Sequence, residues 1–190
     1  MSTKIKANAY ILIGGLSNRF GSPKWEAKLK GVRLIDHTWE ICKVFKKRYI
    51  IGKSDYTQIE YPFLKDKIEK IQTPLNGIYT ALSHSEEKWN FIISCDLPLM
   101  SSKMIQKIWN NGNKSTDAIV PFIYKRSNPV CAFYNNRIQS DIKKELEKDN
   151  LKVLDLLQLI NTNYVQIDEN QKEFTNMNTR NDLEGIINKS

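Results

Sequence analysis

The chain has 190 residues, with 29 Lys and Arg against 21 Asp and Glu, and a formal net charge of +8. This length suits a single domain, and 41% hydrophobic with 26% charged residues exclude a disordered or collagen-like chain. The positive charge allows three kinds of partner: nucleic acid, an anionic membrane, or a polyanionic small molecule.

Features that would place the chain in or across a membrane are missing from the sequence. The apolar run near the N-terminus covers only residues 9–13, too short for a secretion signal or a membrane span. Cys42, Cys95 and Cys131 are odd in number and form no CxxC pair. We therefore expect a cytoplasmic protein in which the cysteines are small buried hydrophobes rather than disulfide partners or zinc ligands.

Hydrophobic patterning predicts strands and helices that alternate through the first two thirds of the chain. A cap at Asn76 is predicted for the second helix, and a cap at Ser101 or Ser102 for the third. In chain order the predictions are a strand at 10–13, a helix at 34–45, strands at 49–51 and 68–71, a helix at 76–82, a strand at 89–95, a helix from about 101 to 109, strands at 117–122 and 129–134, helices at 137–147 and 151–160, a strand at 164–167 and a short helix at about 181–188.

This alternation predicts an α/β fold with a mostly parallel central sheet and helices on both faces. In such sheets ligands bind at the carboxyl ends of the strands. Polar residues that directly follow strands are therefore the first candidates for a functional site.

The loop after the first predicted strand is rich in glycine and carries two cations. Gly14, Gly15 and Gly21 would let backbone N–H groups approach an anion, and Arg19 and Lys24 add positive charge. A triphosphate is the ligand that this combination favours. The loop matches neither the P-loop nor the G-x-G-x-x-G dinucleotide pattern.

Asp96 directly follows the predicted strand at 89–95, in the segment S-C-D-L-P. A carboxylate at that place suits a hard cation such as Mg²⁺. Capping of the next helix is the structural alternative, but Ser101 and Ser102 lie nearer to that helix. A functional role is therefore the favoured interpretation.

Two further segments carry weaker signals. Residues 73–77, T-P-L-N-G, form a turn that enters a helix, which is common in proteins. Residues 174–179, F-T-N-M-N-T, place Asn176 and Asn178 on one side of an extended chain, where they could bind a substrate or complete a metal shell. An ordinary asparagine-rich turn is the alternative.

Together these segments resemble the molybdenum cofactor guanylyltransferases, within the wider group of sugar-phosphate-type nucleotidyltransferases. They occur in the same order as in that family and span nearly the whole chain. The segment at 174–179 favours this branch over the wider group. The resemblance implies a single Rossmann-like domain of the nucleotide-diphospho-sugar transferase type over 1–190. About 1–100 would be the nucleotide-binding half and about 101–190 the acceptor-binding half.

The chain also departs from the family pattern. Ile13 stands where the family has the alanine of L-A-G-G, and Phe20 where it has the methionine of R-M-G. Thr73 replaces the first glycine of G-P-L-x-G, a segment that the family associates with the guanine base, which leaves the identity of the base open. Lys53 or Ser54 stands where an asparagine is usual.

The resemblance implies the following roles for residues of this chain. Arg19, Lys24 and Asp96 would be catalytic. Asp96 and Asn178 would hold Mg²⁺, and Lys152, Asn176 and Asn178 would bind the acceptor. Nucleotide-binding residues would be Leu12, Ile13, Gly14, Gly15, Arg19, Gly21, Lys24, Lys53, Asp66, Pro74, Leu75, Gly77 and Asp96.

The implied reaction joins GMP from GTP to the terminal phosphate of molybdopterin and releases pyrophosphate. The attacking phosphate is already an anion, so the reaction needs no strong general base. This agrees with the sequence, in which neither His37 nor His84 is favoured as a catalytic base. The family further implies transient contact with proteins that deliver the cofactor or receive the product, with no nucleic acid and no membrane. Two alternatives stay open: cytidylyl transfer or transfer to another phosphorylated metabolite, and a non-enzymatic basic protein that binds nucleic acid.

Overall fold

The computed structural model describes residues 4–14, 23–54, 58–177 and 182. The predicted short helix at 181–188 lies outside the described residues except for Asp182. The same holds for four residues with predicted site roles: Gly15, Arg19, Gly21 and Asn178.

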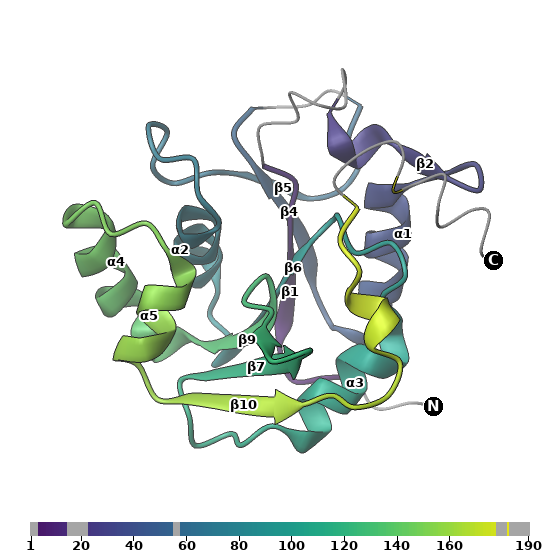
Figure 1. Ribbon diagram of the computed structural model, residues 1–190. Helices are drawn as coiled ribbons and strands as arrows, with labels where there is room; N and C mark the ends of the chain where they lie inside the picture. Colours follow the sequence, from purple (N-terminus) through teal and green to yellow (C-terminus); the bar gives the residue numbers. More distant parts are fainter. Residues whose placement is uncertain (1–3, 15–22, 55–57, 178–181, 183–190) are drawn as a thin grey trace.

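A twisted sheet runs through the middle of the molecule (Figure 1). Its order is β10-β7-β9-β6-β1-β4-β5, and β8 pairs with β7. Its strands are β1 (Asn8–Leu12), β4 (Arg48–Gly52), β5 (Phe63–Lys65), β6 (Trp89–Ser94), β7 (Ala118–Ile123), β8 (Arg126–Ser127), β9 (Cys131–Asn135) and β10 (Thr162–Gln166). A separate hairpin joins β2 (Lys28–Leu29) to β3 (Val32–Arg33).

The first half of the sheet is parallel, and the second half contains the antiparallel pairs. β1 lies between β4 and β6 and is parallel to both, and β5 continues the parallel order beyond β4. β9 runs antiparallel to both β6 and β7, while β10 is parallel to β7. The prediction of a mostly parallel sheet is confirmed.

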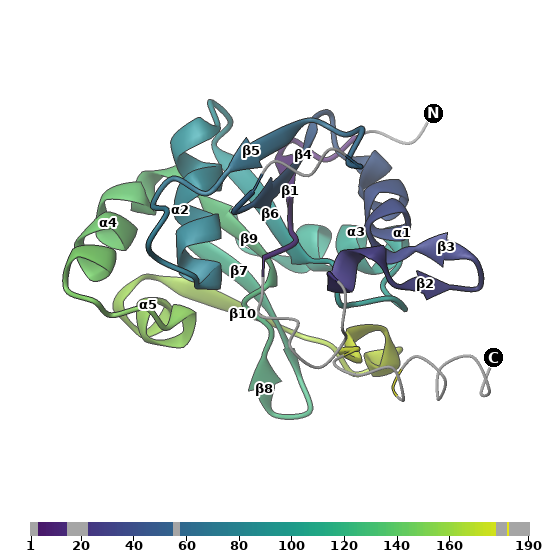
Figure 2. The ribbon, with the colours of Figure 1, turned by 90° about the horizontal axis from the view of Figure 1, so that it is seen from above.

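Helices cover both faces of this sheet, as the sequence predicts (Figures 1 and 2). One side carries α1 and α3, and the other carries α2, α4 and α5. The helices are α1 (Leu34–Ile41), α2 (Pro74–His84), α3 (Ser102–Asn111), α4 (Gln139–Glu147) and α5 (Val153–Leu159), with short 3-10 turns η1 (Lys24–Glu26), η2 (Cys42–Val44), η3 (Asn136–Ile138) and η4 (Gln171–Phe174).

Alternation along the central strands divides the core into two layers, because successive side chains point to opposite faces. In β1, Ala9 and Ile11 join a cluster with Ile35 of α1 and Ile105 of α3. Tyr10 and Leu12 instead join a second cluster with residues of α2, α4 and α5. All five residues of β1 are buried, as expected for the central strand of a sheet covered on both sides.

Two of the predicted local features are wrong. Residues 68–71 form a loop rather than a strand, and the third parallel strand is β5, five residues earlier. Asn76 does not cap α2: Thr73 occupies the N-cap position without a side-chain hydrogen bond and the helix begins at Pro74, while the Asn76 side chain is fully buried. By contrast the cap of α3 is confirmed, since Ser101 Oγ accepts a hydrogen bond from Met104 N.

The three cysteines are free and buried, as predicted. Burial raises the pKa of Cys95 to about 12, so its thiol is neutral and unreactive at physiological pH. Among the described residues, no helix combines the length and apolar character needed to cross a membrane.

Strand order determines where a ligand can bind. From β1 the chain moves outward to β4 and β5 and then returns to the opposite side of β1 with β6. The connections after β1 and β6 therefore diverge and leave a crevice at the carboxyl ends of these strands. Described residues just after these strands, Gly14 after β1, Lys53 after β4, Asp66 after β5 and Asp96 after β6, meet there.

Candidate active site

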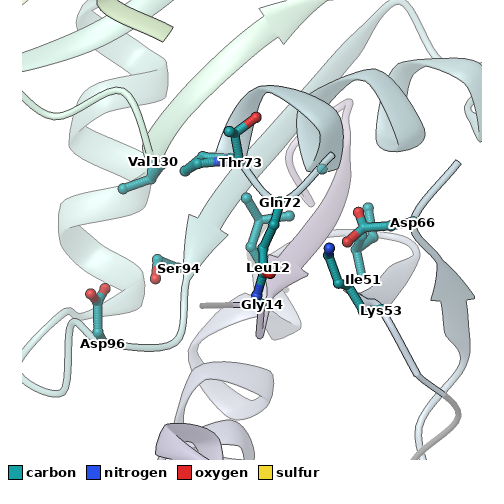
Figure 3. Close-up of a pocket in the computed structure, with 12 residues that line it drawn as sticks. Leu12, Gly14, Ile51, Lys53, Asp66, Gln72, Thr73, Ser94, Asp96 and Val130 are labelled. Carbon is teal, nitrogen blue, oxygen red and sulfur yellow. The ribbon is translucent and has the colours of Figure 1, made fainter. Parts of the chain in front are cut away.

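A cavity of about 240 Å³ occupies this crevice. Figure 3 shows Ser94 and Asp96 on one side of it, Lys53 and Asp66 on the other, and Leu12 and Gly14 between them. The lining residues are Leu12, Gly14, Ile51, Lys53, Asp66, Gln72, Thr73, Pro74, Gly77, Ser94, Asp96 and Val130.

The floor of the cavity is the end of β1. Leu12 O accepts a hydrogen bond from Cys95 N at 3.2 Å, and Ile13 N donates to Ile51 O at 3.0 Å. These bonds hold the strand end between its two neighbours. A Cβ at Gly14 would meet no other described residue within 4 Å, so no described side chain covers this backbone. Ile13, by contrast, is buried in the core cluster on the α1 side.

Lys24 and Asp96 meet at one end of the cavity although they lie 72 residues apart in sequence. Lys24 Nζ donates to Asp96 Oδ2 at 3.2 Å, and the two side chains are 20% and 18% exposed. Lys24 begins the short turn η1, which is anchored by the buried ring of Trp25. Asp96 follows β6, and its carbonyl accepts a hydrogen bond from Met177 N at 2.9 Å.

The second oxygen of Asp96 is the most informative atom of the site. Asp96 Oδ1 is buried and has no hydrogen-bond partner among the described residues. A buried carboxylate oxygen is costly unless it accepts a hydrogen bond or a cation, so this atom is suited to hold a ligand. A hard cation satisfies such an oxygen, which fits the residue to a divalent metal ion.

Lys53 and Asp66 form the opposite wall. Lys53 follows β4 and Asp66 follows β5, and Asp66 N donates to Gly52 O at 2.8 Å. Burial raises the pKa of the Asp66 carboxyl above its ordinary value, and the positive charge of Lys53 partly offsets this rise. The wall thus presents a carboxylate acceptor beside an ammonium donor.

Asp66→Asn is expected to raise the melting temperature at pH 7 and to weaken nucleotide binding. The folded-state pKa of Asp66 lies above its unfolded value, so the folded protein binds the proton more tightly. Stability therefore falls as pH rises through the interval between the two pKa values. The amide removes this loss. Thermal unfolding between about pH 4 and pH 8 should show the advantage of the variant shrinking as pH falls, and an advantage that does not change with pH would contradict this explanation.

The loop between β5 and α2 is held by the buried side chain of Asn76. Its Nδ2 donates to Ile68 O at 2.8 Å and to Ile71 O at 3.0 Å, and its Oδ1 accepts from Ile68 N at 3.3 Å. This clamp explains why residues 68–71 do not form a strand: their backbone groups bond to a helix side chain instead. It also positions Asp66 and Gln72, which flank the clamped segment.

Asn76→Ala is expected to lower the free energy of unfolding by about 2 kcal/mol, because several backbone groups lose their partner at once. At this size that corresponds to a melting temperature lower by about 4–8 °C. Nucleotide affinity should fall as well. Asn111→Ala is the matched control: this exposed asparagine donates to Lys107 O, and its loss should change stability by less than about 0.5 kcal/mol. Equal effects in both variants would contradict the clamp.

The first turn of α2 closes the cavity from above. Thr73 and Pro74 line it, and Thr73 Oγ1 is buried without a hydrogen-bond partner. Gly77 lies against β1 so closely that a Cβ would be 2.8 Å from Leu12 Cδ2. Leu75 differs from these residues because it is fully buried in the core, so only its main chain could face a ligand.

Two predicted acceptor residues that the structure describes, Asn176 and Lys152, do not line this cavity. Asn176 lines a second cavity, together with residues of the β7–β8 hairpin. Lys152 is exposed at the N-terminal end of α5 and lines neither of these two cavities.

Sequence reasoning missed several lining residues. Gln72, Ser94 and Val130 belong to the first cavity, and Tyr124 and Arg126 to the second. Ser94 belongs to the segment S-C-D-L-P that the sequence singles out, and Gln72 directly precedes T-P-L-N-G, so closeness to these motifs was an available signal. Val130, Tyr124 and Arg126 carry no such signal, since only the strand order brings them to the site.

The cavity thus combines a glycine at a strand end with a lysine–carboxylate pair, where the strand order reverses. A family model described as MobA-like NTP transferase domain matches residues 9–161. The chain belongs to this family, and it is a nucleotidyltransferase. The sequence-based assignment to this family is thus confirmed, and the non-enzymatic alternative is excluded.

Curated relatives support the assignment over nearly the full length. A protein of Flavobacterium johnsoniae is 31% identical over 93% of this chain and 94% of its own. One of Natranaerobius thermophilus is 32% identical, with 93% of each chain covered. Both bear the name "Probable molybdenum cofactor guanylyltransferase".

Solved structures confirm the nucleotide-diphospho-sugar transferase fold. Molybdopterin-guanine dinucleotide biosynthesis protein A of Archaeoglobus fulgidus aligns with a TM-score of 0.82 at 23% identity, covering 96% of this chain and 100% of that chain. The 2-C-methyl-D-erythritol 4-phosphate cytidylyltransferase of Thermus thermophilus aligns with a TM-score of 0.70 at 11% identity, covering 94% and 96%. At these identities the likeness concerns the fold alone.

Proposed function

We propose that this enzyme transfers GMP from GTP to the terminal phosphate of molybdopterin, which yields molybdopterin guanine dinucleotide and pyrophosphate. The observation that carries the proposal is the Lys24–Asp96 pair at the end of the cavity, with Asp96 Oδ1 buried and unpartnered. The names of the relatives supply the substrates. A pair of this kind suits charge neutralisation at a phosphate, whereas an uncharged ligand would give it no such role.

The nucleotide would lie along the cavity with its base toward α2 and its phosphates toward Lys24. The base would meet Thr73, Pro74 and Gly77, and the opposite wall would offer it Asp66. Gly14 would let the backbone approach the phosphates closely, because nothing described fills the space above it. Gly15, Arg19 and Gly21, which lie outside the described residues, are proposed to complete this contact.

A divalent cation, Mg²⁺ in our proposal, would be held by Asp96. Asn178, which lies outside the described residues, is proposed as a second ligand. The described residues contain no group of three His, Cys, Asp or Glu side chains that could hold a metal ion. One carboxylate with substrate phosphates is the usual way in which proteins hold Mg²⁺. When bound, the ion would neutralise charge on the nucleotide phosphates.

In the reaction, an oxygen of the acceptor phosphate attacks the α-phosphorus of GTP. A new P–O bond forms, the bond from the α-phosphorus to the bridging oxygen breaks, and pyrophosphate leaves with the electron pair. No proton needs to move, so the enzyme needs no general base. Lys24 stabilises the charge that develops on the leaving group, and the walls hold both substrates in line.

Purified protein with GTP, molybdopterin and Mg²⁺ tests the proposal. Pyrophosphate and the dinucleotide should appear in equal amounts, as measured by coupled assay and mass spectrometry. CTP, ATP and UTP are run in parallel, because Thr73 replaces the usual glycine near the base. Product from CTP alone would establish cytidylyl transfer instead. Product only when another phosphorylated metabolite replaces molybdopterin would establish that metabolite as the acceptor. No pyrophosphate with any pair would contradict the function.

Thermal unfolding gives an independent readout of nucleotide choice. A ligand at a hundred times its dissociation constant stabilises the folded state by about 2.7 kcal/mol. GTP with Mg²⁺ should therefore raise the melting temperature by about 5–10 °C, more than CTP does.

The proposal extends to a cytoplasmic location, to a nucleotide-binding half over about 1–100, and to an acceptor-binding half over about 101–190 that includes Lys152 and Asn176. It also includes transient contact with proteins that supply the acceptor or receive the product.

A further inference from the structure

Residues 173–177, which we call the C-terminal strap, are fastened to the connection between β6 and α3. Glu173 Oε2 accepts a hydrogen bond from Ser101 N at 2.8 Å, and Met177 N donates to Asp96 O at 2.9 Å. Figure 1 shows this part of the chain, in yellow, running beside α1 toward η1. Because both bonds are made to the connection that carries Asp96, the strap restrains the movement of that connection.

The Met177 side chain is buried against the elements that carry Lys24. It is 0% exposed, and it forms a core cluster with Leu34, the first residue of α1, against which Ala27 and Leu29 pack. This cluster is separate from the two large layers of the core. Met177 therefore joins the strap to the segment that directly follows Lys24.

Backbone bonds connect this cluster to Lys24. Leu34 N donates to Ala27 O at 2.9 Å, and Ala27 N donates to Lys24 O at 3.2 Å. Lys24 Nζ in turn donates to Asp96 Oδ2 at 3.2 Å. A closed chain of contacts results, which leads from Asp96 through Met177 and η1 back to Asp96. The buried methionine and the charged pair thus link the same two segments.

Support of this kind matters because charge neutralisation at a phosphate depends on accurate placement of the charged groups. Lys24 lies on a turn of three residues and Asp96 on the turn after β6, so both side chains start from short segments. A displacement of about 1 Å can lower a rate by about 100-fold. A methionine that only fills space would stabilise the fold, whereas one that fixes the pair would also change the rate.

We propose that Met177 is a positioning residue: its buried side chain holds η1 against the turn after β6 and so sets the geometry of the Lys24–Asp96 pair for nucleotidyl transfer. The inference rests on the proposed function, because it uses the role given there to the pair. It adds an apolar residue that acts through the pair and takes no part in the chemistry.

The test compares Met177→Ala with Leu156→Ala, which truncates a fully buried side chain of α5 in the core layer on the α2 side. Both changes should lower the melting temperature by about 5–10 °C. Met177→Ala should in addition lower kcat by about 10- to 100-fold, while the KM for GTP stays within about threefold. Met177→Leu keeps most of the volume and should restore kcat to within about threefold of the original. Equal kcat values in Met177→Ala and Leu156→Ala would overturn the proposal.

A double variant shows whether Met177 acts through Lys24. In a protein that already carries Lys24→Met, the change Met177→Ala should lower kcat by less than about twofold further, because the geometry that it supports is already lost. A full additional loss in that background would contradict a role through the pair. Met177→Val removes less volume and takes the place of Met177→Ala in all these comparisons if that variant does not fold.

Binding of Mn²⁺ in the presence of GTP, followed by electron paramagnetic resonance, is a readout that needs no turnover. Met177→Ala should raise the dissociation constant of Mn²⁺ about 10-fold, and Leu156→Ala should leave it unchanged. If the unchanged protein forms product from CTP or with another acceptor, the proposed function fails, and the same comparison with those substrates decides the role of Met177. If it forms no product, the function fails and Mn²⁺ binding alone decides that role. If it also binds no Mn²⁺, both fail together.

Discussion

Asp96→Asn is expected to lower kcat for nucleotidyl transfer by about 10³-fold, while the protein stays folded. The amide keeps the size of the side chain but removes the charge from Oδ1, the buried atom that has no partner among the described residues. Without that charge the site loses its proposed hold on a divalent ion. The change also removes the charged partner of Lys24, so the loss concerns both elements that would neutralise the triphosphate.

Two measurements check this expectation. Steady-state kinetics give kcat, and Mn²⁺ binding in the presence of GTP, followed by electron paramagnetic resonance, reports on the ion without requiring turnover. Asp168→Asn is the matched control: this exposed aspartate contacts Gln166 and lies outside both cavities. Asp96→Asn with kcat within tenfold of the original and undiminished Mn²⁺ binding would refute the assigned role.

Lys24→Met is expected to lower kcat by about 10²- to 10³-fold, with a smaller effect on the KM for molybdopterin. Methionine keeps much of the length of the side chain and removes its positive charge. Because charge on the leaving pyrophosphate grows as the bond breaks, the ammonium contributes more to the transition state than to the bound substrate. Lys24→Arg keeps the charge but not the compact ammonium, so it should retain intermediate activity.

Lys28→Met provides the control, because Lys28 is exposed on the neighbouring hairpin and lines neither cavity. The double variant Lys24→Met with Asp96→Asn adds a further test. If both groups act on the same transition state, the combined loss should be smaller than the product of the single losses. Fully multiplicative losses would contradict a shared role, and an active Lys24→Met would refute the role of the ammonium.

Local patterns in the sequence were sufficient for much of the fold. β1, β6 and β7 are mostly apolar, because strands covered on both faces contain few polar residues, and this pattern is visible without a structure. The cap of α3 is equally local, since Ser101 bonds to a residue only three positions away. Two local predictions were wrong, the strand at 68–71 and the Asn76 cap. The apolar run at 68–71 is short, and the Asn76 side chain bonds to the backbone of that segment rather than to its own helix.

The site divides in the same way. The sequence by itself determined which residues are chemically suited to a nucleotide, namely the glycines after β1, Lys24 and Asp96, because motif and order are properties of the chain. Only the tertiary structure decided that Lys24 meets Asp96 across 72 residues, and that one oxygen of Asp96 stays without a partner. It also decided that the hairpin carrying Tyr124 and Arg126 faces Asn176. Such contacts depend on strand order, and no local pattern encodes which strands become neighbours.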